Sequence, residues 1–202
     1  MRRETCRPVF GIAPYTAAMG VCDPDLGGHA ARVGTLAETI ARRLGWDDER
    51  LEDVRLGASL HDVGKIAVPL EVLRKPGALD PDEIAQIRAH PVEGAWLISG
   101  VRSLLRALPY VLFHHERWDG AGYPTRRAGI EIPLEGRILA VADAFDAMTS
   151  PRPYRDALSR DVALEEVARC AGTQFDPQVA ELFLEAWSTG EIAASEPLAA
   201  TG

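Results

Sequence analysis

The chain has 202 residues, enough for one domain whose core needs no disulfides, and its 47% hydrophobic and 26% charged residues are ordinary for a globular protein. A formal net charge of −8 excludes a general role in coating DNA or RNA, which requires a basic face. Three widely spaced cysteines, no apolar run near the ~20 residues of a membrane span and no signal peptide predict a cytoplasmic protein.

Helical periodicity predicts three helices in the first half of the chain. Apolar residues recur at helical spacing over residues 30–44, and Gly45 ends this helix. A second helix begins at residue 51 and runs into the His-Asp dipeptide at residues 61–62. A third helix is predicted over residues 80–90. It begins at an N-cap, Asp80, and ends near residue 90, because Pro91 disfavours helical geometry in the residue before it.

Turn residues separate the elements predicted in the second half. Residues 119–124 (DGAGYP) predict a loop, in which two glycines allow unusual backbone angles. Residues 129–133 (GIEIP) predict a short extended arm, and the tail from residue 191 is expected to fray. Four further helices are predicted over residues 111–116, 137–148, 162–171 and 177–187, the last capped by Asp176.

These elements predict an all-α fold, a compact bundle of several helices with at most a short extended arm near the 119–124 loop. No internal repeat and no linker divides the chain. The main domain is therefore expected over residues 23–190, between a short N-terminal arm over 1–22 and a flexible tail over 191–202.

Histidines and aspartates form the most informative pattern of the sequence. A lone histidine or a single HD dipeptide is more often structural than a metal ligand. Here, however, five histidines and two aspartates lie on separate predicted helices or helix ends, and bundles build metal sites from ligands on facing helices. The candidate ligands are His29, His61, Asp62, His90, His114, His115 and Asp143.

The chemistry of this set favours more than one metal ion. Imidazole and carboxylate ligands without thiolates suit Fe, Mn, Co, Ni or Zn, and argue against a structural zinc site. Seven side chains exceed what one metal can use, and two metals clamp the attacking and leaving oxygens of a phosphodiester displacement. Asp62 is the natural bridging ligand. Lys65, one helical turn beyond His61, is either a surface lysine or a cation that stabilises charge on a phosphate oxygen.

Four segments carry a resemblance to a known family. Residues 61–65 read HDVGK, 75–77 KPG, 114–124 HHERWDGAGYP and 137–155 RILAVADAFDAMTSPRPYR. They resemble the HD-GYP family, a branch of the HD-domain phosphohydrolases. This resemblance implies an HD-type helical bundle around a metal centre with two or three Fe or Mn ions. It also implies a bacterial signalling enzyme that hydrolyses cyclic di-GMP to pGpG or GMP through a metal-bridging hydroxide.

The resemblance also implies roles for individual residues. It makes the seven candidate ligands metal-binding, and it gives Lys65 a phosphate contact and a catalytic electrostatic role. Arg152 and Arg155 match a cationic pair that grips ligand phosphates, the alternative being solvated loop charge. Tyr123 is expected to stack on or line up a guanine. Trinuclear members carry a glutamate four residues before the first histidine, and Asp25 stands at that position, which makes it the candidate ligand of a third metal.

Three functions are compatible with these residues. The first is a cyclic di-GMP phosphodiesterase. The second is a phosphohydrolase acting on another nucleotide, including cyclic GMP-AMP. The complete GYP loop argues against a nucleoside mono- or triphosphate as substrate. The third is a non-catalytic cyclic dinucleotide receptor, or an adaptor whose GYP loop contacts diguanylate cyclases. The complete ligand set argues against this third function.

Overall fold

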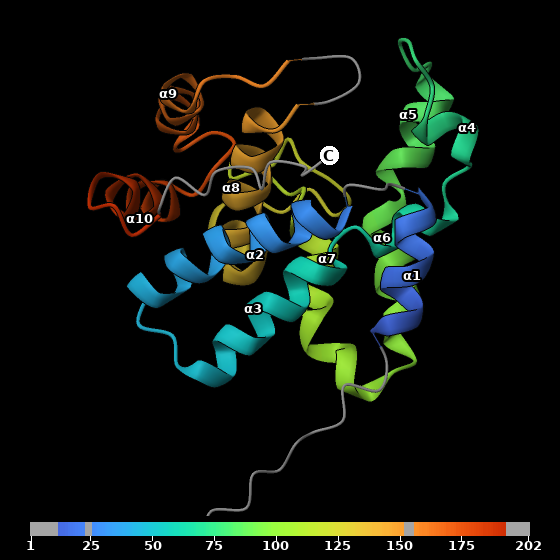
Figure 1. Cartoon of the computed structure of the whole chain (residues 1–202), viewed down its shortest axis with the longest axis horizontal. Coiled ribbons are helices and arrows are strands. Elements are labelled where there is room, and N and C mark those ends of the chain that lie inside the picture. Colours follow the sequence, from blue (N-terminus) through green and yellow to red (C-terminus); the bar gives the residue numbers. More distant parts are fainter. Residues whose placement is uncertain (1–11, 23–25, 152–155, 193–202) are drawn as a thin grey trace, which may run out of the picture.

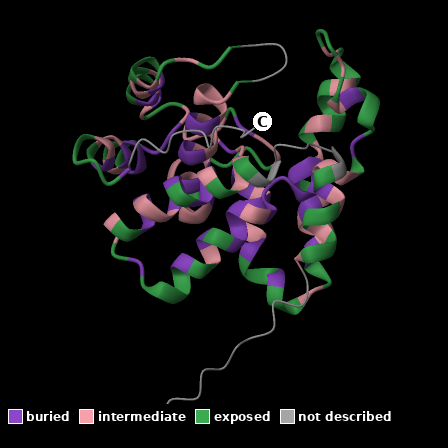
Figure 2. Cartoon of the chain, viewed as in Figure 1, coloured by how far each residue is buried: buried purple, intermediate pink, exposed green. Residues whose placement is uncertain are grey.

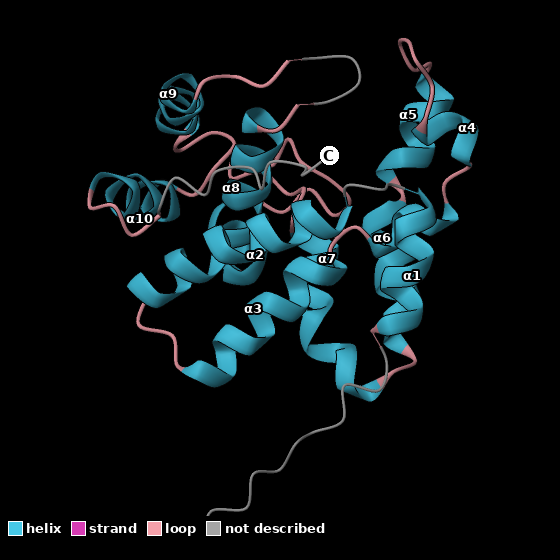
Figure 3. Ribbon diagram, in the orientation of Figure 1, coloured by secondary structure: helices cyan, strands magenta, loops and turns pink. Residues whose placement is uncertain are grey.

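The computed structural model describes residues 12–22, 26–151 and 156–192. Within these ranges the chain is helical and has no strand, apart from one isolated bridge between Ala171 and Phe175 (Figures 1 and 3). The prediction of an all-α bundle is therefore confirmed. The same ranges contain no helix that combines the length and the apolar character needed to cross a bilayer.

Loops connect the helices, as Figure 3 shows. In chain order they are α1 (Ala13–Cys22), α2 (Leu26–Arg43), α3 (Asp48–Leu60), the 3-10 turn η1 (Val63–Ala67), α4 (Leu70–Leu73), α5 (Pro81–Arg88), α6 (His90–Ser99), η2 (Arg102–Ala107), α7 (Leu108–Phe113), η3 (Gly129–Glu131), α8 (Leu134–Thr149), α9 (Arg160–Cys170) and α10 (Pro177–Ser188).

Helix caps explain several of these boundaries. The Asp80 side chain accepts hydrogen bonds from the backbone N–H groups of Asp82 and Glu83, which confirms the predicted start of α5. Asp176 caps α10 in the same way. The prediction missed α6, which begins at His90 directly after α5. Pro91 lies in the first turn of α6. Backbone N–H groups there have no acceptor within the helix, so the N–H that proline lacks costs no hydrogen bond.

Two other expectations were wrong in detail. The extended arm predicted over 129–133 is instead a 3-10 turn over Gly129–Glu131. The helix predicted over 111–116 begins earlier, at Leu108, and ends at Phe113, so the two adjacent histidines follow it. The N-terminal arm predicted over 1–22 contains α1, and the domain boundaries stay predictions.

The core consists of two hydrophobic clusters that share α3 and α7. The larger packs α2, α3 and α8 against α9 and α10, and its centre includes Ile40, Val54 and Phe183. The smaller packs α1, η1 and α6 against other side chains of α3 and α7, such as Leu60 and Val111. Figure 2 shows buried residues, in purple, on α3 and on the helices around it. Because α3 and α7 belong to both clusters, their C-terminal ends lie where the clusters meet.

Candidate metal centre

The seven predicted ligands lie together in the folded chain. Among the described residues, ligand atoms fall into two groups, and within each group they are no more than 4.8 Å apart. The first group is Asp62, His90, His114 and His115, and the second is His29, His61 and Asp143. The geometry therefore brings together residues from α2, α6 and α8 and from the ends of α3 and α7. Metal binding by these residues stays a prediction.

Asp62 connects the two groups through its two carboxylate oxygens. Its Oδ1 lies 3.3 Å from His90 Nε2 and 4.0 Å from His114 Nε2. Its Oδ2 lies 3.4 Å from His61 Nε2 and 2.6 Å from Lys65 Nζ. A single buried carboxylate thus faces both groups, which is the arrangement that a bridging ligand requires.

Backbone hydrogen bonds fix the tautomers of three imidazoles. The Nδ1–H of His61 donates to the carbonyl of Ala58, 2.8 Å away, and that of His90 donates to the carbonyl of Ile87, 2.7 Å away. His114 donates through Nδ1 to backbone carbonyls of its own helix. A carbonyl only accepts, so in each neutral ring Nδ1 carries the proton and Nε2 presents a lone pair to the centre.

This tautomer assignment tests whether the residues suit a metal ion. The Nε2 atoms of His90 and His114 lie 3.2 Å apart in a buried site. Two facing lone pairs repel each other, whereas a cation between them binds both. The helix ends act in the same direction, because α3 and α7 present their partially negative C-termini to the centre. The donor set and its environment therefore fit divalent cations.

His29 is oriented differently, by two residues that the sequence analysis missed. Its Nδ1 lies 2.7 Å from Oδ2 of Asp146, and Arg32 donates to the same carboxylate. Asp146 is buried, and it follows Asp143 by one helical turn on α8. That i, i+3 spacing was visible in the sequence, but only the fold shows that both carboxylates face His29.

Replacing Asp146 with asparagine is expected to weaken metal binding by about tenfold to a hundredfold. Carboxylates that hold a ligating histidine in place typically contribute this much to metal affinity. Titration of the metal-free protein with Mn(II), followed calorimetrically, measures the change. Asp161→Asn, an exposed position in the first turn of α9, is the matched control. Equal affinities of the two variants would contradict the role given to Asp146.

Burial sets the protonation of the first group. Burial lowers the pKa of His114 well below its usual value, and it is also the main reason why the pKa of His115 is lowered to about 4. It lowers the pKa of His90 as well. Burial alone would raise the pKa of Asp62, but Lys65 and the nearby imidazoles outweigh it and lower that pKa. At neutral pH this group therefore offers neutral imidazoles and an ionised carboxylate, the forms that bind metal.

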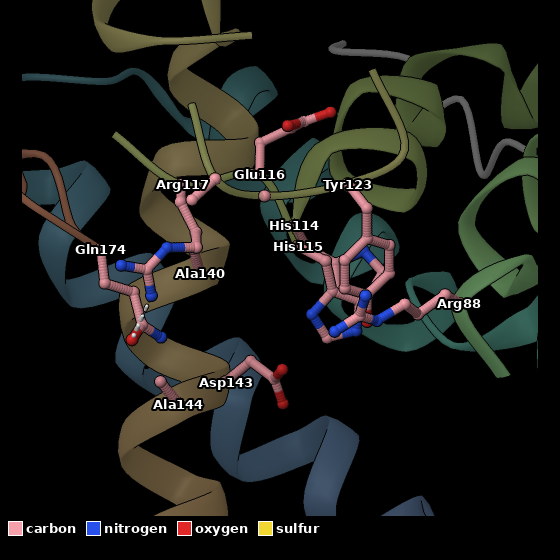
Figure 4. Close-up of a pocket in the computed structure, with 12 residues that line it drawn as sticks. Arg88, His114, His115, Glu116, Arg117, Tyr123, Ala140, Asp143, Ala144 and Gln174 are labelled. Carbon is pink, nitrogen blue, oxygen red and sulfur yellow. Dashed lines mark hydrogen bonds between the residues drawn. The ribbon is translucent and has the colours of Figure 1, made fainter. Parts of the chain in front are cut away.

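A cavity of about 300 Å³ opens beside the centre (Figure 4). Asp143 and His115 line it, and Tyr123 packs on the His115 ring with 4.8 Å between ring centroids and 25° between planes. The His115 ring therefore covers one face of Tyr123. The predicted stacking of Tyr123 on a guanine stays a prediction. Asp25, Arg152 and Arg155 lie outside the described residues.

The loop that carries Tyr123 is held by two carboxylates. Glu116 is buried and accepts hydrogen bonds from the backbone N–H groups of Thr125 and Arg126. Asp119 pairs with Arg117 and accepts from the N–H of Ala121, so it organises the loop. Tyr123 is thereby fixed against the cavity.

Comparison with known proteins identifies the family. A family model described as an HD domain matches residues 21–179. The chain belongs to the HD-domain family. Its sequence is 43% identical over 155 residues to the cyclic di-GMP phosphodiesterase response regulator RpfG of Xanthomonas campestris, covering 76% of this chain and 41% of that protein. It is also 38% identical over 188 residues to the 3'3'-cGAMP-specific phosphodiesterase 2 of Vibrio cholerae, covering 92% of this chain and 35% of that protein.

Solved structures agree with this HD-domain assignment. A crystal structure of a cyclic GMP-AMP-specific phosphodiesterase from V. cholerae superposes with a TM-score of 0.68 over 90% of this chain and 50% of that one. At 20% identity, that similarity establishes the fold. The HD domain described here spans less than half the length of the two sequence relatives. Its long HHERWDGAGYP segment places it in the HD-GYP branch, as the resemblance implied.

Proposed function

We propose that this chain is a metal-dependent phosphodiesterase that hydrolyses cyclic di-GMP to pGpG or GMP, with two or three Fe or Mn ions. The observation that carries the proposal is the position of Asp62, whose two oxygens face two groups of imidazoles and carboxylates beside a cavity. The RpfG relative, which shares 43% identity, is named for hydrolysis of the same nucleotide.

The chain's own groups have distinct tasks in this proposal. The seven ligands hold the ions, and bound divalent cations stabilise the negative charge that develops on a phosphodiester during hydrolysis. Lys65 Nζ lies 2.6 Å from Asp62 Oδ2, so its charge is held beside the position of the reacting phosphate. The backbone bonds of His61, His90 and His114 keep the imidazoles aligned without reorganisation.

Turnover with and without metal tests this function. Protein loaded anaerobically with Fe(II) or Mn(II) is expected to convert cyclic di-GMP to a linear product, and chelation is expected to stop the reaction. Chromatography separates pGpG from GMP, and elemental analysis gives the metal count. Nucleotide binding without turnover in the loaded protein would instead favour a receptor. Contact with diguanylate cyclases stays a prediction.

One observation favours a second candidate substrate, 3'3'-cyclic GMP-AMP. The V. cholerae relative named for that nucleotide is 38% identical to this chain. A panel of cyclic di-GMP, cyclic GMP-AMP and cyclic di-AMP under identical metal loading ranks the substrates by kcat/KM. A higher value for cyclic GMP-AMP would replace cyclic di-GMP as the main substrate.

Metal binding is expected to release a proton from His29 at neutral pH. Burial lowers the pKa of His29, but its hydrogen bonds to Asp143 and Asp146 outweigh burial and raise it to about 9 in the metal-free chain. Below pH 9 the ring is therefore protonated, and a metal at Nε2 must displace that proton. Affinity for Mn(II) should then keep rising between pH 7 and 9.

Calorimetry in two buffers of different ionisation enthalpy counts the protons released. The count is expected to fall as the pH passes 9, where His29 is already neutral. His115 contributes no proton at neutral pH because its pKa is about 4. A proton count that does not change between pH 7.5 and 10 would show that His29 is not protonated in the metal-free protein.

A further inference from the structure

The cavity beside the metal centre has two arginines on its wall that differ in their surroundings. Arg117 donates to Asp119 over 2.6 Å and to Gln174 over 3.1 Å, so a carboxylate already balances its charge. Arg88 makes no ion pair with any residue of the described ranges 12–22, 26–151 and 156–192. Its guanidinium instead lies 5.3 Å from the centroid of the Tyr123 ring.

Arg88 is placed to act on a ligand in this cavity. It is the last residue of α5, two positions before His90. Figure 4 shows its side chain reaching towards Tyr123 and His115, on the opposite side of the cavity from Gln174. The loop that Glu116 holds keeps Tyr123 in place, so the guanidinium rests on a fixed ring beside a candidate metal ligand.

The substrate class of the proposed function supplies an anion for this cation. A cyclic dinucleotide has two phosphodiesters, and only one of them occupies the metal centre during a hydrolytic step. The other carries a full negative charge into a protein of net charge −8, where it needs a counter-charge. A guanidinium suits this task because its planar fork donates two parallel hydrogen bonds to phosphate oxygens.

We propose that Arg88 is a substrate-binding residue, which holds the phosphodiester that is not being cleaved. This inference rests on the proposed function and adds a position on α5 to it. Arg88 thereby favours substrates with two phosphates over those with one. A purely structural Arg88, which stabilises the C-terminal end of α5 through the helix dipole, would leave substrate affinity unchanged.

Kinetics of Arg88→Ala in the metal-loaded protein test this role. We expect KM for cyclic di-GMP to rise about tenfold to a hundredfold, the worth of one charge-assisted hydrogen bond, with kcat changed less than about threefold. The rise of KM with NaCl concentration should become shallower, because one ion pair with the substrate is lost. Arg88→Lys, which keeps the charge, should recover part of the affinity.

Two controls separate binding of the second phosphate from other effects. Bis(4-nitrophenyl) phosphate has a single phosphodiester, so its kcat/KM should fall much less in Arg88→Ala than that of cyclic di-GMP. Arg102→Ala, an exposed arginine of η2 outside the cavity, should behave as wild type with both substrates. Circular dichroism checks that each variant is folded.

The outcomes distinguish this inference from the function on which it rests. If the wild type hydrolyses cyclic di-GMP and Arg88→Ala keeps its KM, Arg88 does not bind substrate and the proposed function stands. Equal losses on both substrates would also overturn the inference, because Arg88 would then act on the metal centre. If the loaded wild type hydrolyses neither compound, the proposed function fails and this inference fails with it.

Discussion

Asp62→Asn is expected to lower turnover of cyclic di-GMP by about a thousandfold or more. Metal ions contribute several kcal/mol to the stabilisation of such transition states, and each ~1.4 kcal/mol corresponds to a factor of ten in rate. The oxygens of Asp62 face both groups of ligands, so its loss should affect both. Asparagine keeps the shape of the side chain but removes the charge that balances the cations.

Metal content distinguishes this explanation from a folding defect. Elemental analysis of Asp62→Asn should show fewer metal ions per chain, while circular dichroism remains that of a helical protein. Asp161→Asn removes an exposed carboxylate of α9 and should match the wild type in both measurements. Wild-type turnover and metal content in Asp62→Asn would disprove the bridging role.

Gly64→Ala is expected to cause a large loss of stability. A Cβ atom at residue 64 would lie 1.9 Å from the carbonyl oxygen of His90 and 2.5 Å from the backbone nitrogen of Gly94. Both atoms belong to the backbone of α6, so the whole helix has to move away from η1. Overpacking of this kind is expected to cost about 3 kcal/mol or more.

Thermal unfolding of the metal-free chain measures this cost. About 3 kcal/mol corresponds to a decrease in Tm of roughly 6–12 °C for a domain of this size. Gly100→Ala is the matched control, because residue 100 has right-handed helical angles and nothing lies within 4 Å of its added Cβ. Its Tm should stay within a few degrees of the wild type. Equal Tm values for the two variants would show that α6 adapts to the extra atom.

Much of the fold and of the candidate site followed from local rules. The Asp80 and Asp176 caps and the amphipathic pattern of α2 depend on residues close together in sequence, and each gave a helix where it was expected. The histidine pattern was informative because its members lie on helices that a bundle must pack together. The sequence therefore predicted that these residues meet.

The missed features depend on tertiary context or on ambiguous local rules. Pro91 disfavours helical geometry before it and is equally suited to a first helical turn, so it was interpreted as an end when it also marks a beginning. The apolar residues of GIEIP suggested an extended arm, but the segment closes as a 3-10 turn. The i, i+3 spacing of Asp146 was visible but ambiguous and Arg88 gave no signal, since the significance of both depends on what lies opposite them in space.

The position of Asp143 late in the chain has a consequence for biosynthesis. Under the proposed function, the ligands come from helices spread between His29 and Asp143. A ribosome releases them in that order, so a nascent chain without α8 lacks the single carboxylate of the second group. Complete loading with metal therefore has to wait until α8 has been synthesised, so the ligands of the earlier helices are in place before the centre can be completed.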